Sequence, residues 1–306
     1  MSEKEEQFYY SEIFKSFQGE GNYTGKSTIW LRLFACNLQC NGFGQKDPTD
    51  PSSYVLPYKD VDLNIIKTVE DLPVLEYGCD SSYTWSKRFK HLMKHETGTQ
   101  IAENLRQLLI TADNPNGLFK HPKTNVEFHM AYTGGEPMLP LNQRAIIEIT
   151  NAFKKQGNLP KMVTVETNGT QALTDDMDRM IAYHYMHKTG HEWFWSVSPK
   201  LFSTSGEKAS KAIKPSVIKQ YCNISNKGQL KFVCNGTDQS WTEIEDALQQ
   251  YRNVGCNWDV YIMPVGATKE QQQTDLTAKI AVDAMDRGYH VSGRLHCYIF
   301  GNQVGT

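Results

Sequence analysis

From residue 100 onward, the chain alternates between two patterns of apolar residues. Continuous apolar runs, typical of buried strands, are followed by segments in which apolar residues recur every three or four positions, which is typical of helices. The strand-like runs lie at 126–132, 162–169, 193–198, 229–234, 260–264 and 294–300. The helix-like segments lie at 100–113, 141–155, 174–187, 238–251 and 275–287. This alternation predicts an α/β fold with a parallel sheet and crossover helices.

The first hundred residues do not follow this alternation. A buried strand is expected at 27–34, after a glycine-rich loop at 17–21. Residues 41–78 hold four prolines and only short apolar clusters, so we interpret them as an insertion rather than as part of the core. The basic stretch 87–95 is expected to be a solvated helix face.

Composition and charge narrow the function classes. With 306 residues and 39% hydrophobic content, the chain can bury a sizeable core in one large domain or two small ones. Its net charge of −2, from 32 basic and 34 acidic residues, gives no electrostatic footprint for nucleic acid or an anionic membrane. The charged N-terminus does not resemble a signal peptide, and no apolar run approaches the length of a membrane span. We therefore expect a soluble, cytoplasmic protein.

Polar and glycine-rich residues follow four of the expected strands, where a parallel sheet presents its ligand-binding edge. They are Thr133-Gly-Gly-Glu-Pro137, Glu166-Thr-Asn-Gly169, Ser198-Pro-Lys200 and Met263-Pro-Val-Gly266. A loop with Cys36 and Cys40 follows the strand at 27–34 in the same way. These strand ends are predicted to converge on one site.

The seven cysteines are not expected to form a disulfide framework, because their number is odd and the N-terminal residues do not resemble a secretion signal. Four of them stand alone and are interpreted as buried, unreactive thiols: Cys222, Cys234, Cys256 and Cys297. Cys36 and Cys40, directly after a strand, indicate a metal or an iron–sulfur cluster instead. Arg32, inside that strand, needs an acidic partner. The residues alone leave open whether this partner is an anionic ligand or a structural carboxylate.

The motifs occur in an order that identifies a family. They are Gln18-Gly-Glu-Gly21, Arg32, the two cysteines, Cys79-Asp-Ser-Ser-Tyr-Thr-Trp85, the four strand ends above and Arg294-Leu-His296. In this order the chain resembles the radical S-adenosylmethionine (SAM) enzymes and, more narrowly, the 7-carboxy-7-deazaguanine synthases. The match covers nearly the whole chain except 41–78 and stretches between motifs. It implies one domain, 1–306, with a partial (β/α) TIM-like barrel of the radical SAM type and the insertion 41–78 in its cluster-binding loop.

The resemblance implies a 4Fe–4S cluster, although the cysteine spacing departs from the family. The usual Cys-x3-Cys-x2-Cys triplet would place a cysteine where this chain has Phe43. Because the stretch that begins at Cys79 normally starts with the third ligand, the resemblance assigns the cluster to Cys36, Cys40 and Cys79. A longer loop adds little entropic cost, since that cost grows only logarithmically with length. The alternatives are a lost cluster and a zinc site, which needs a fourth ligand such as His91 or His95.

The resemblance also implies the reaction and its other ligands. A lyase of this family converts 6-carboxy-5,6,7,8-tetrahydropterin to 7-carboxy-7-deazaguanine with loss of ammonia, in queuosine-type 7-deazapurine biosynthesis. No catalytic residue is expected beyond the cluster and SAM. The residues expected to bind SAM are Gly134, Gly135, Glu136, Glu166, Asn168, Ser198, Pro199, Lys200, Met263, Pro264, Val265 and Gly266. Those expected to bind the pterin are Phe17, Gln18, Gly19, Glu20, Arg32, Thr133 and Thr306.

Further expectations follow from the same resemblance. Mg²⁺ is expected between the substrate carboxylate and the hydroxyl of Ser81, where the family usually has threonine. A flavodoxin or ferredoxin is expected as reductant, and the protein is expected to be a homodimer. A catalytic role for His296 and a structural one are both open, and His129 is interpreted as structural. The rival functions are another radical SAM enzyme, such as a glycyl-radical activase, and a non-catalytic metal-bearing interaction module.

Overall fold

The structure is a computed structural model that describes residues 5–301 and 303–305. Within these residues, the strands form one curved sheet in the order β3-β1-β2-β4-β5-β6-β7-β8-β9. The strands are β1 (Gln7–Phe17), β2 (Ser27–Leu33), β3 (Lys94–Thr97), β4 (His129–Gly134), β5 (Met162–Thr167), β6 (Glu192–Val197), β7 (Gly228–Cys234), β8 (Asp259–Pro264) and β9 (His290–Val291). All neighbours from β2 to β9 pair in parallel, whereas β1 pairs antiparallel with β2 and with β3.

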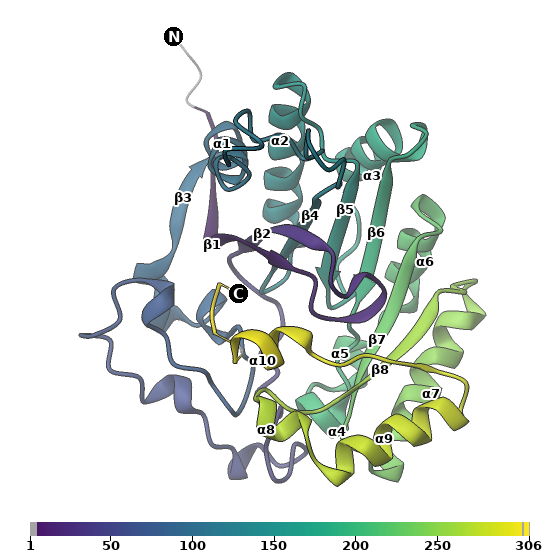
Figure 1. The fold of residues 1–306 in the computed structure, drawn as a ribbon. Helices are drawn as coiled ribbons and strands as arrows, with labels where there is room; N and C mark the ends of the chain where they lie inside the picture. The colour runs from purple at the N-terminus through teal and green to yellow at the C-terminus, as the bar shows by residue number, and fades with distance from the viewer. Residues whose placement is uncertain (1–4, 302, 306) are drawn as a thin grey trace.

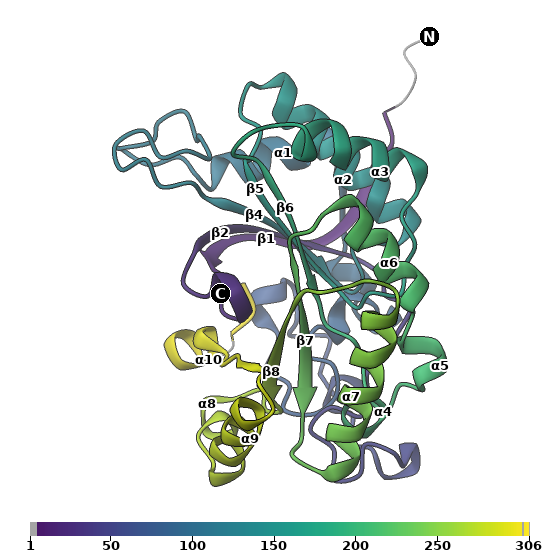
Figure 2. The ribbon, with the colours of Figure 1, turned by 90° about the vertical axis from the view of Figure 1, so that its right-hand side faces the viewer.

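The long helices connect consecutive parallel strands, and most of them cover one face of the sheet (Figures 1 and 2). They are α1 (Gly98–Gln107), α2 (Pro140–Lys155), α3 (Asp175–Ile181), α6 (Pro215–Ile224), α7 (Asp238–Asn253) and α9 (Asp275–Asp286). The shorter ones are α4 (Phe202–Ser205), α5 (Ala209–Ala212), α8 (Lys269–Gln272) and α10 (Leu295–Phe300), and a π-helix, Ala182–Met186, follows α3. Figure 2 shows β1 and β2 curling away from this layer, so that the sheet curves toward its other face.

The main hydrophobic core lies between the sheet and this helix layer. Its largest side chains are aromatic, among them Trp193, Trp195 and Tyr221, all fully buried. Trp195 stacks on Tyr221 with ring centroids 4.1 Å apart, which joins β6 to α6. The expected parallel sheet and partial (β/α) barrel are therefore confirmed.

Helix α6, between β6 and β7, was not expected, and three further features differ from the expectations. Residues 294–300 form helix α10 rather than a strand, because the sheet already ends at β9 and the segment instead turns toward the loop after β1. The long strand β1 was not expected, although its alternation of exposed Gln7 and Tyr9 with buried Phe8 and Tyr10 is typical of a strand. The basic stretch 87–95 is not one solvated helix.

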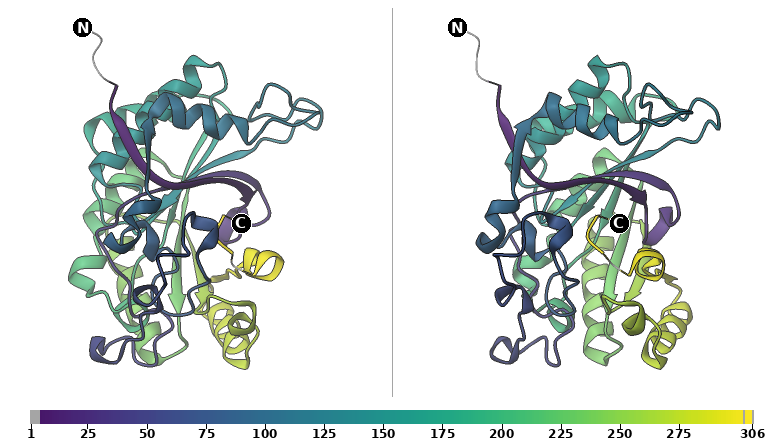
Figure 3. Two further views of the ribbon diagram at one scale, coloured as in Figure 1. Left: turned by 90° about the vertical axis from the view of Figure 1, so that its left-hand side faces the viewer. Right: turned by 60° about the vertical axis from the view of Figure 1, so that its left-hand side comes forward.

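Residues 41–92 are irregular and have a small core of their own. Short 3-10 helices interrupt the segment at Pro51–Ser53, Pro57–Lys59, Val69–Asp71, Ser82–Thr84 and Lys87–Leu92. Seven buried side chains form this second core: Tyr58, Ile66, Val69, Leu75, Tyr83, Phe89 and Leu92. Phe89 and Leu92 belong to the basic stretch, so its charged side chains point outward while two apolar ones anchor it. Figure 3 shows this segment on the side of the molecule opposite α9, with the end of the chain between them.

In the described part of the chain, no helix is both long enough and apolar enough to cross a membrane.

Candidate active site

A cavity of about 530 Å³ opens at the carboxyl ends of the parallel strands. It brings together most of the residues that the sequence assigned to one site. These are Phe17, Gln18, Gly19, Glu20, Arg32, Cys36, Cys40, Cys79, Ser81, Thr133, Gly134, Gly135, Glu166, Asn168, Ser198, Lys200, Met263, Pro264, Val265 and Gly266. Glu136 and Pro199 do not line it. Thr306 lies outside the described residues, so its expected contact with the substrate stays a prediction.

The three candidate cluster cysteines share one small patch of the cavity wall. Cys36, Cys40 and Cys79 pack with Leu38 and Ala212. Burial raises the pKa of Cys36 to about 12 and that of Cys79 to about 11, and it raises the pKa of Cys40 as well. The thiols are therefore protonated in the free protein, and binding of a metal centre would release their protons.

The ends of segment 41–78 lie side by side, which places Cys79 beside the other two cysteines. The amide of Gly78 donates to the carbonyl of Phe43 at 2.7 Å, so the chain leaves and returns at one point. Phe43 occupies the position where the family pattern has its third cysteine, and Cys79 directly follows this junction.

The cysteine loop is also held from the other side, by Glu207. This buried carboxylate accepts hydrogen bonds from the amides of Gln39 at 2.7 Å and Cys40 at 3.0 Å. Cys40 has a positive φ of 52°, a conformation that a non-glycine residue adopts only when its surroundings fix it. Glu207 was not found from the sequence, because a lone glutamate far from any motif gives no signal.

The alternative of a zinc site finds no support in the geometry. Within residues 5–301 and 303–305, no group of three or more His, Cys, Asp or Glu side chains converges closely enough to hold a single metal ion. His91 contacts the carbonyl of Ile66 through Nε2, and the ring of His95 lies tilted against that of Tyr9, with centroids 5.9 Å apart. A mononuclear zinc needs all its ligands on one ion, whereas a cluster takes each thiolate on a separate iron. The assignment of the three neighbouring thiols to a cluster stays a prediction.

The glycines of the Thr133–Pro137 turn allow the cysteine loop to pack against it. A Cβ at Gly134 would collide with the backbone of Leu33, and one at Gly135 would collide with the carbonyl of Ala35. The amide of Glu136 completes this contact by donating to the carbonyl of Ala35 at 2.9 Å. The turn and the cysteine loop are thus one unit.

The Glu136 side chain lies behind this turn rather than in the cavity. Its carboxylate accepts hydrogen bonds from the amides of Met138 and Asn168, both at 2.8 Å, and from the hydroxyl of Thr167 at 2.6 Å. Burial raises its pKa. Glu136 therefore joins the ends of β4 and β5, and its expected pairing with the SAM ammonium group stays a prediction.

Side chains from other parts of the chain pack so closely on the loop after β1 that they leave no room for a Cβ at Gly19 or Gly21. A Cβ at Gly19 would collide with the ring of His296, and one at Gly21 would collide with Gln229. Gly21 also has a φ of +68°, a region that favours glycine. Contacts within the chain therefore explain both glycines.

Arg32 has a structural carboxylate as its acidic partner, and it also lines the cavity. Its Nε donates to Glu12 at 2.5 Å, so a structural carboxylate neutralises part of its charge. Its Nη1 lies 3.2 Å from the hydroxyl of Ser81, and its guanidinium also lines the cavity. Arg32 is therefore fixed by Glu12 and still available to an anion in the cavity.

A buried lysine that was not expected, Lys231, organises the carboxylates on the opposite wall. Its Nζ lies 2.5 Å from Glu20 and 3.2 Å from Glu166. The Gln18 amide donates to the other oxygen of Glu166 at 2.8 Å. The signal in the sequence was a lone lysine within the apolar strand 229–234, the same signal that singled out Arg32.

Two remaining strand ends present polar groups to the cavity. The Asn168 amide donates to the side chain of Asn37 at 3.1 Å, and Lys200 donates to the Ser198 hydroxyl at 2.9 Å. Lys200 also lies over the ring of Phe43, with Nζ 5.6 Å from its centroid. A positive charge is therefore held beside the cysteine patch.

His296 and His129 lie in different surroundings. His296 lines the cavity and packs on Gly19, and burial lowers its pKa to about 4, so it is neutral at pH 7. His129 lies outside the cavity with its ring edge-on to Tyr23, which agrees with a structural role.

Residues 73–76 also line the cavity, which the sequence did not indicate. Leu75 belongs to the second core, and the carbonyl of Glu76 closely approaches Gly44. The irregular segment therefore contributes a wall of the site as well as Cys79.

Comparisons with known proteins agree on one family. No protein-family profile matches the chain. A 7-carboxy-7-deazaguanine synthase of Rhodopirellula baltica is 25% identical over 97% of this chain and 88% of the relative. The enzyme of that name from Pyrobaculum aerophilum is 24% identical over 96% and 95%, and that from Halobacterium salinarum is 24% identical over 97% and 91%. The crystal structure of QueE from Escherichia coli shares the fold, with a TM-score of 0.52 and 17% identity over 95% of both chains.

Proposed function

Because the chain belongs to the family of 7-carboxy-7-deazaguanine synthases, we propose that it converts 6-carboxy-5,6,7,8-tetrahydropterin to 7-carboxy-7-deazaguanine with loss of ammonia. The enzyme is a radical SAM carbon–nitrogen lyase of 7-deazapurine biosynthesis. One observation carries this proposal. A single cavity gathers three cysteines, four polar strand ends and a buried arginine that faces the cavity, although these residues are distributed over most of the chain.

The proposed cluster ligands are Cys36, Cys40 and Cys79. When bound, the cluster and SAM supply the radical chemistry that begins the reaction. The chain fixes the cysteines through Glu207 on one side and through the turn at Gly135 on the other. Lys200 beside the patch offsets part of the negative charge that thiolates bring.

The proposed SAM site consists of the strand ends on both sides of the cysteine patch. Gly134 and Gly135 leave backbone close to the cavity, where a methionine moiety can approach without a side chain in between. Asn168, Ser198 and Lys200 supply polar contacts from the ends of β5 and β6. The turn 263–266 supplies the wall at β8. Glu136, whose carboxylate joins the ends of β4 and β5, and Pro199 are the remaining residues proposed to bind SAM.

The proposed pterin site lies between Arg32 and the carboxylates held by Lys231. Arg32 can pair with the substrate carboxylate, because only its Nε is used by Glu12. Phe17, Gln18, Gly19 and Thr133 line the same space, and Glu20 offers carboxylate oxygens to the ring nitrogens. The Lys231 ammonium keeps Glu20 charged, since the cations around this carboxylate hold its pKa below the usual range against the effect of burial.

The proposed Mg²⁺ site is built on Ser81. Its hydroxyl lies 3.2 Å from Arg32 and 3.1 Å from Asp80, so it stands where the substrate carboxylate would meet the arginine. Mg²⁺ commonly uses few protein ligands and keeps several waters. Serine supplies the same oxygen as threonine.

Three further proposals complete the account. Residues 41–78 are an insertion in the cluster loop of a single domain, which the hydrogen bond between Gly78 and Phe43 supports. A flavodoxin or ferredoxin supplies the electrons, and the protein acts as a cytoplasmic homodimer.

Anaerobic reconstitution with iron and sulfide, followed by incubation with the tetrahydropterin, SAM, Mg²⁺ and dithionite, tests the function. We expect 7-carboxy-7-deazaguanine and ammonia in equal amounts, and loss of at least ten-fold in kcat/KM for Arg32→Met. Arg144→Met, which removes an exposed arginine paired with Glu6, is the control. A reconstituted enzyme that cleaves SAM but leaves the tetrahydropterin unchanged would contradict the proposal and point to another radical SAM reaction.

A further inference from the structure

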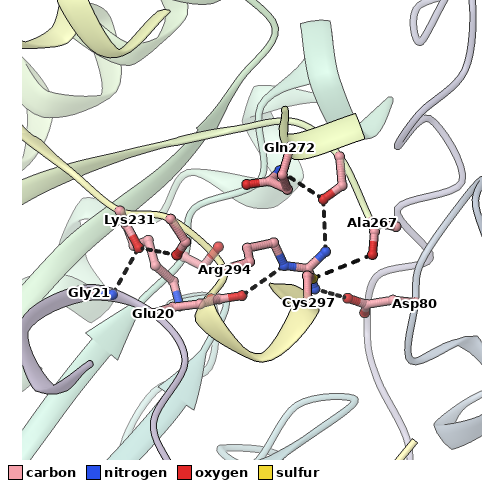
Figure 4. A network of polar contacts seen from close by, with 12 residues as sticks. Glu20, Gly21, Asp80, Lys231, Ala267, Gln272, Arg294 and Cys297 are labelled. Atoms are coloured by element: carbon pink, nitrogen blue, oxygen red, sulfur yellow. Dashed lines mark hydrogen bonds and ion pairs between the residues drawn. The ribbon is translucent and has the colours of Figure 1, made fainter. Parts of the chain in front are cut away.

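The guanidinium of Arg294 joins three separate walls of the cavity (Figure 4). Its Nε donates to Glu20 at 3.1 Å, its Nη1 donates to the carbonyl of Gly266 at 2.9 Å, and its Nη2 donates to Asp80 at 2.9 Å. Glu20 belongs to the loop after β1, Gly266 follows β8, and Asp80 is the neighbour of Cys79. Arg294 itself is only 9% exposed.

These contacts bridge the open side of the barrel. Within the described residues, the sheet runs from β3 to β9 without closing on itself, so no strand pairing joins the loop after β1 to the end of β8. The segment before α10 crosses this gap. The Leu295 amide donates to the carbonyl of Gly19 at 2.9 Å, the Gly21 amide donates to the hydroxyl of Ser292 at 2.8 Å, and the Ser292 amide donates to Ile262.

Arg294 is one of two cations that pair with the Glu20 carboxylate, and Lys231 is the other. Its Oε2 contacts Lys231, and its Oε1 accepts the hydrogen bond from Arg294. The Glu20 side chain is 15% exposed, so an unpaired oxygen would have little water to replace the lost donor. The Asp80 side chain is about half exposed and gains less from its ion pair. Loss of Arg294 should therefore affect Glu20 more than Asp80.

We propose that Arg294 is a positioning residue with two linked effects. It closes the open side of the barrel, and it holds the Glu20 carboxylate in the orientation that meets the substrate. The effect on substrate rests on the proposed function, whereas closure rests on the contacts of Arg294 alone. Lysine at this position keeps the charge but lacks the planar fork that reaches three acceptors at once.

Hydrogen exchange measured by mass spectrometry on the reconstituted holoenzyme tests closure without any substrate. In Arg294→Met, exchange is expected to accelerate at least ten-fold in peptides that contain the Gly21 and Leu295 amides, and less so in Arg294→Lys. Arg179→Met, an exposed arginine on α3, should leave these peptides unchanged. Unchanged exchange in Arg294→Met would overturn the closure role.

Steady-state kinetics on the same variants test the effect on Glu20. Losing one hydrogen bond between charged groups should raise the KM for the tetrahydropterin by about 10- to 100-fold, with partial rescue in Arg294→Lys. The double variant Arg294→Met/Glu20→Gln should bind no more weakly than Glu20→Gln alone, because both changes disable one carboxylate. Additive effects, or an unchanged KM, would show that Arg294 only supports the fold. If wild-type enzyme forms no product while Arg294→Met still accelerates exchange, the proposed function fails and closure stands.

Discussion

Strands β4–β8 and segment 41–92 line the same cavity but are built in different ways. In the sheet, parallel register fixes where each strand ends, so the polar residues after β4, β5, β6 and β8 meet without further help. In segment 41–92, short turns and a small core position the residues that face the cavity. The sheet provides most of the proposed SAM contacts, whereas the irregular segment provides Cys79, Asp80 and Ser81.

The difference shows where a site of this kind can change during evolution. Segment 41–78 leaves and re-enters the cysteine loop at two hydrogen-bonded residues, so its length does not disturb the sheet. The strand ends have no such freedom, because a shifted register would move every ligand-facing side chain. The irregular segment can therefore vary as long as its junction and its contact with the cavity remain.

The largest effect is expected where the turn at Gly135 packs against the cysteine loop, because this contact joins the two regions. Gly135→Ala puts a methyl group against the carbonyl of Ala35, a backbone atom of the cysteine loop that cannot move aside easily. We expect iron retention after reconstitution to fall to near background while far-UV circular dichroism stays native. Gly293→Ala, at a glycine with open space around it, is the control. Normal iron content in Gly135→Ala would show that the turn and the cysteine loop are not one unit.

A leucine-to-alanine substitution in each core compares how much the two cores contribute to stability. Leu105→Ala, on α1 in the main core, should lower the free energy of unfolding by about 3–5 kcal/mol. Leu75→Ala, in the second core and at the cavity wall, should cost about 2 kcal/mol and mainly accelerate hydrogen exchange within 41–92. Urea titration and exchange measure both quantities. Equal global destabilisation by the two variants would mean that the regions unfold together.

Most of the sheet could be predicted because its signals are local. Continuous apolar runs and helical spacing identified β5–β8 and the helices between them except α6, and polar strand ends pointed to one edge. The segment 294–300 was predicted wrongly, because its aromatic and β-branched residues favour a strand while its long-range contact with Gly19 decides its path. Lys231 was overlooked although a lone lysine in an apolar strand is a local signal, whereas Glu207 and residues 73–76 were missed for a related reason. Their roles depend on partners far away in the sequence.

A smaller effect in the sheet region should depend on pH. Burial lowers the pKa of His129 to about 4, below its ordinary value, so the folded protein binds fewer protons than the unfolded chain between about pH 6.5 and 4. Its contribution to stability is therefore complete above pH 6.5 and is lost as the pH falls. At pH 5 the loss should reach about 2 kcal/mol relative to pH 7. His129→Phe should flatten the dependence of the apoprotein's unfolding free energy on pH, and exposed His187→Phe should not.

The central claim is that Cys79, across the irregular segment, completes a cluster with Cys36 and Cys40. Iron content and the electron paramagnetic resonance signal of anaerobically reconstituted, reduced Cys79→Ala test this claim most directly, with Cys222→Ala on α6 as control. The wild type and the control should bind about four iron atoms per chain and show the signal of a reduced 4Fe–4S cluster. Cys79→Ala should retain almost no iron and should not cleave SAM. Full iron content, an unchanged signal and SAM cleavage in Cys79→Ala would contradict the account.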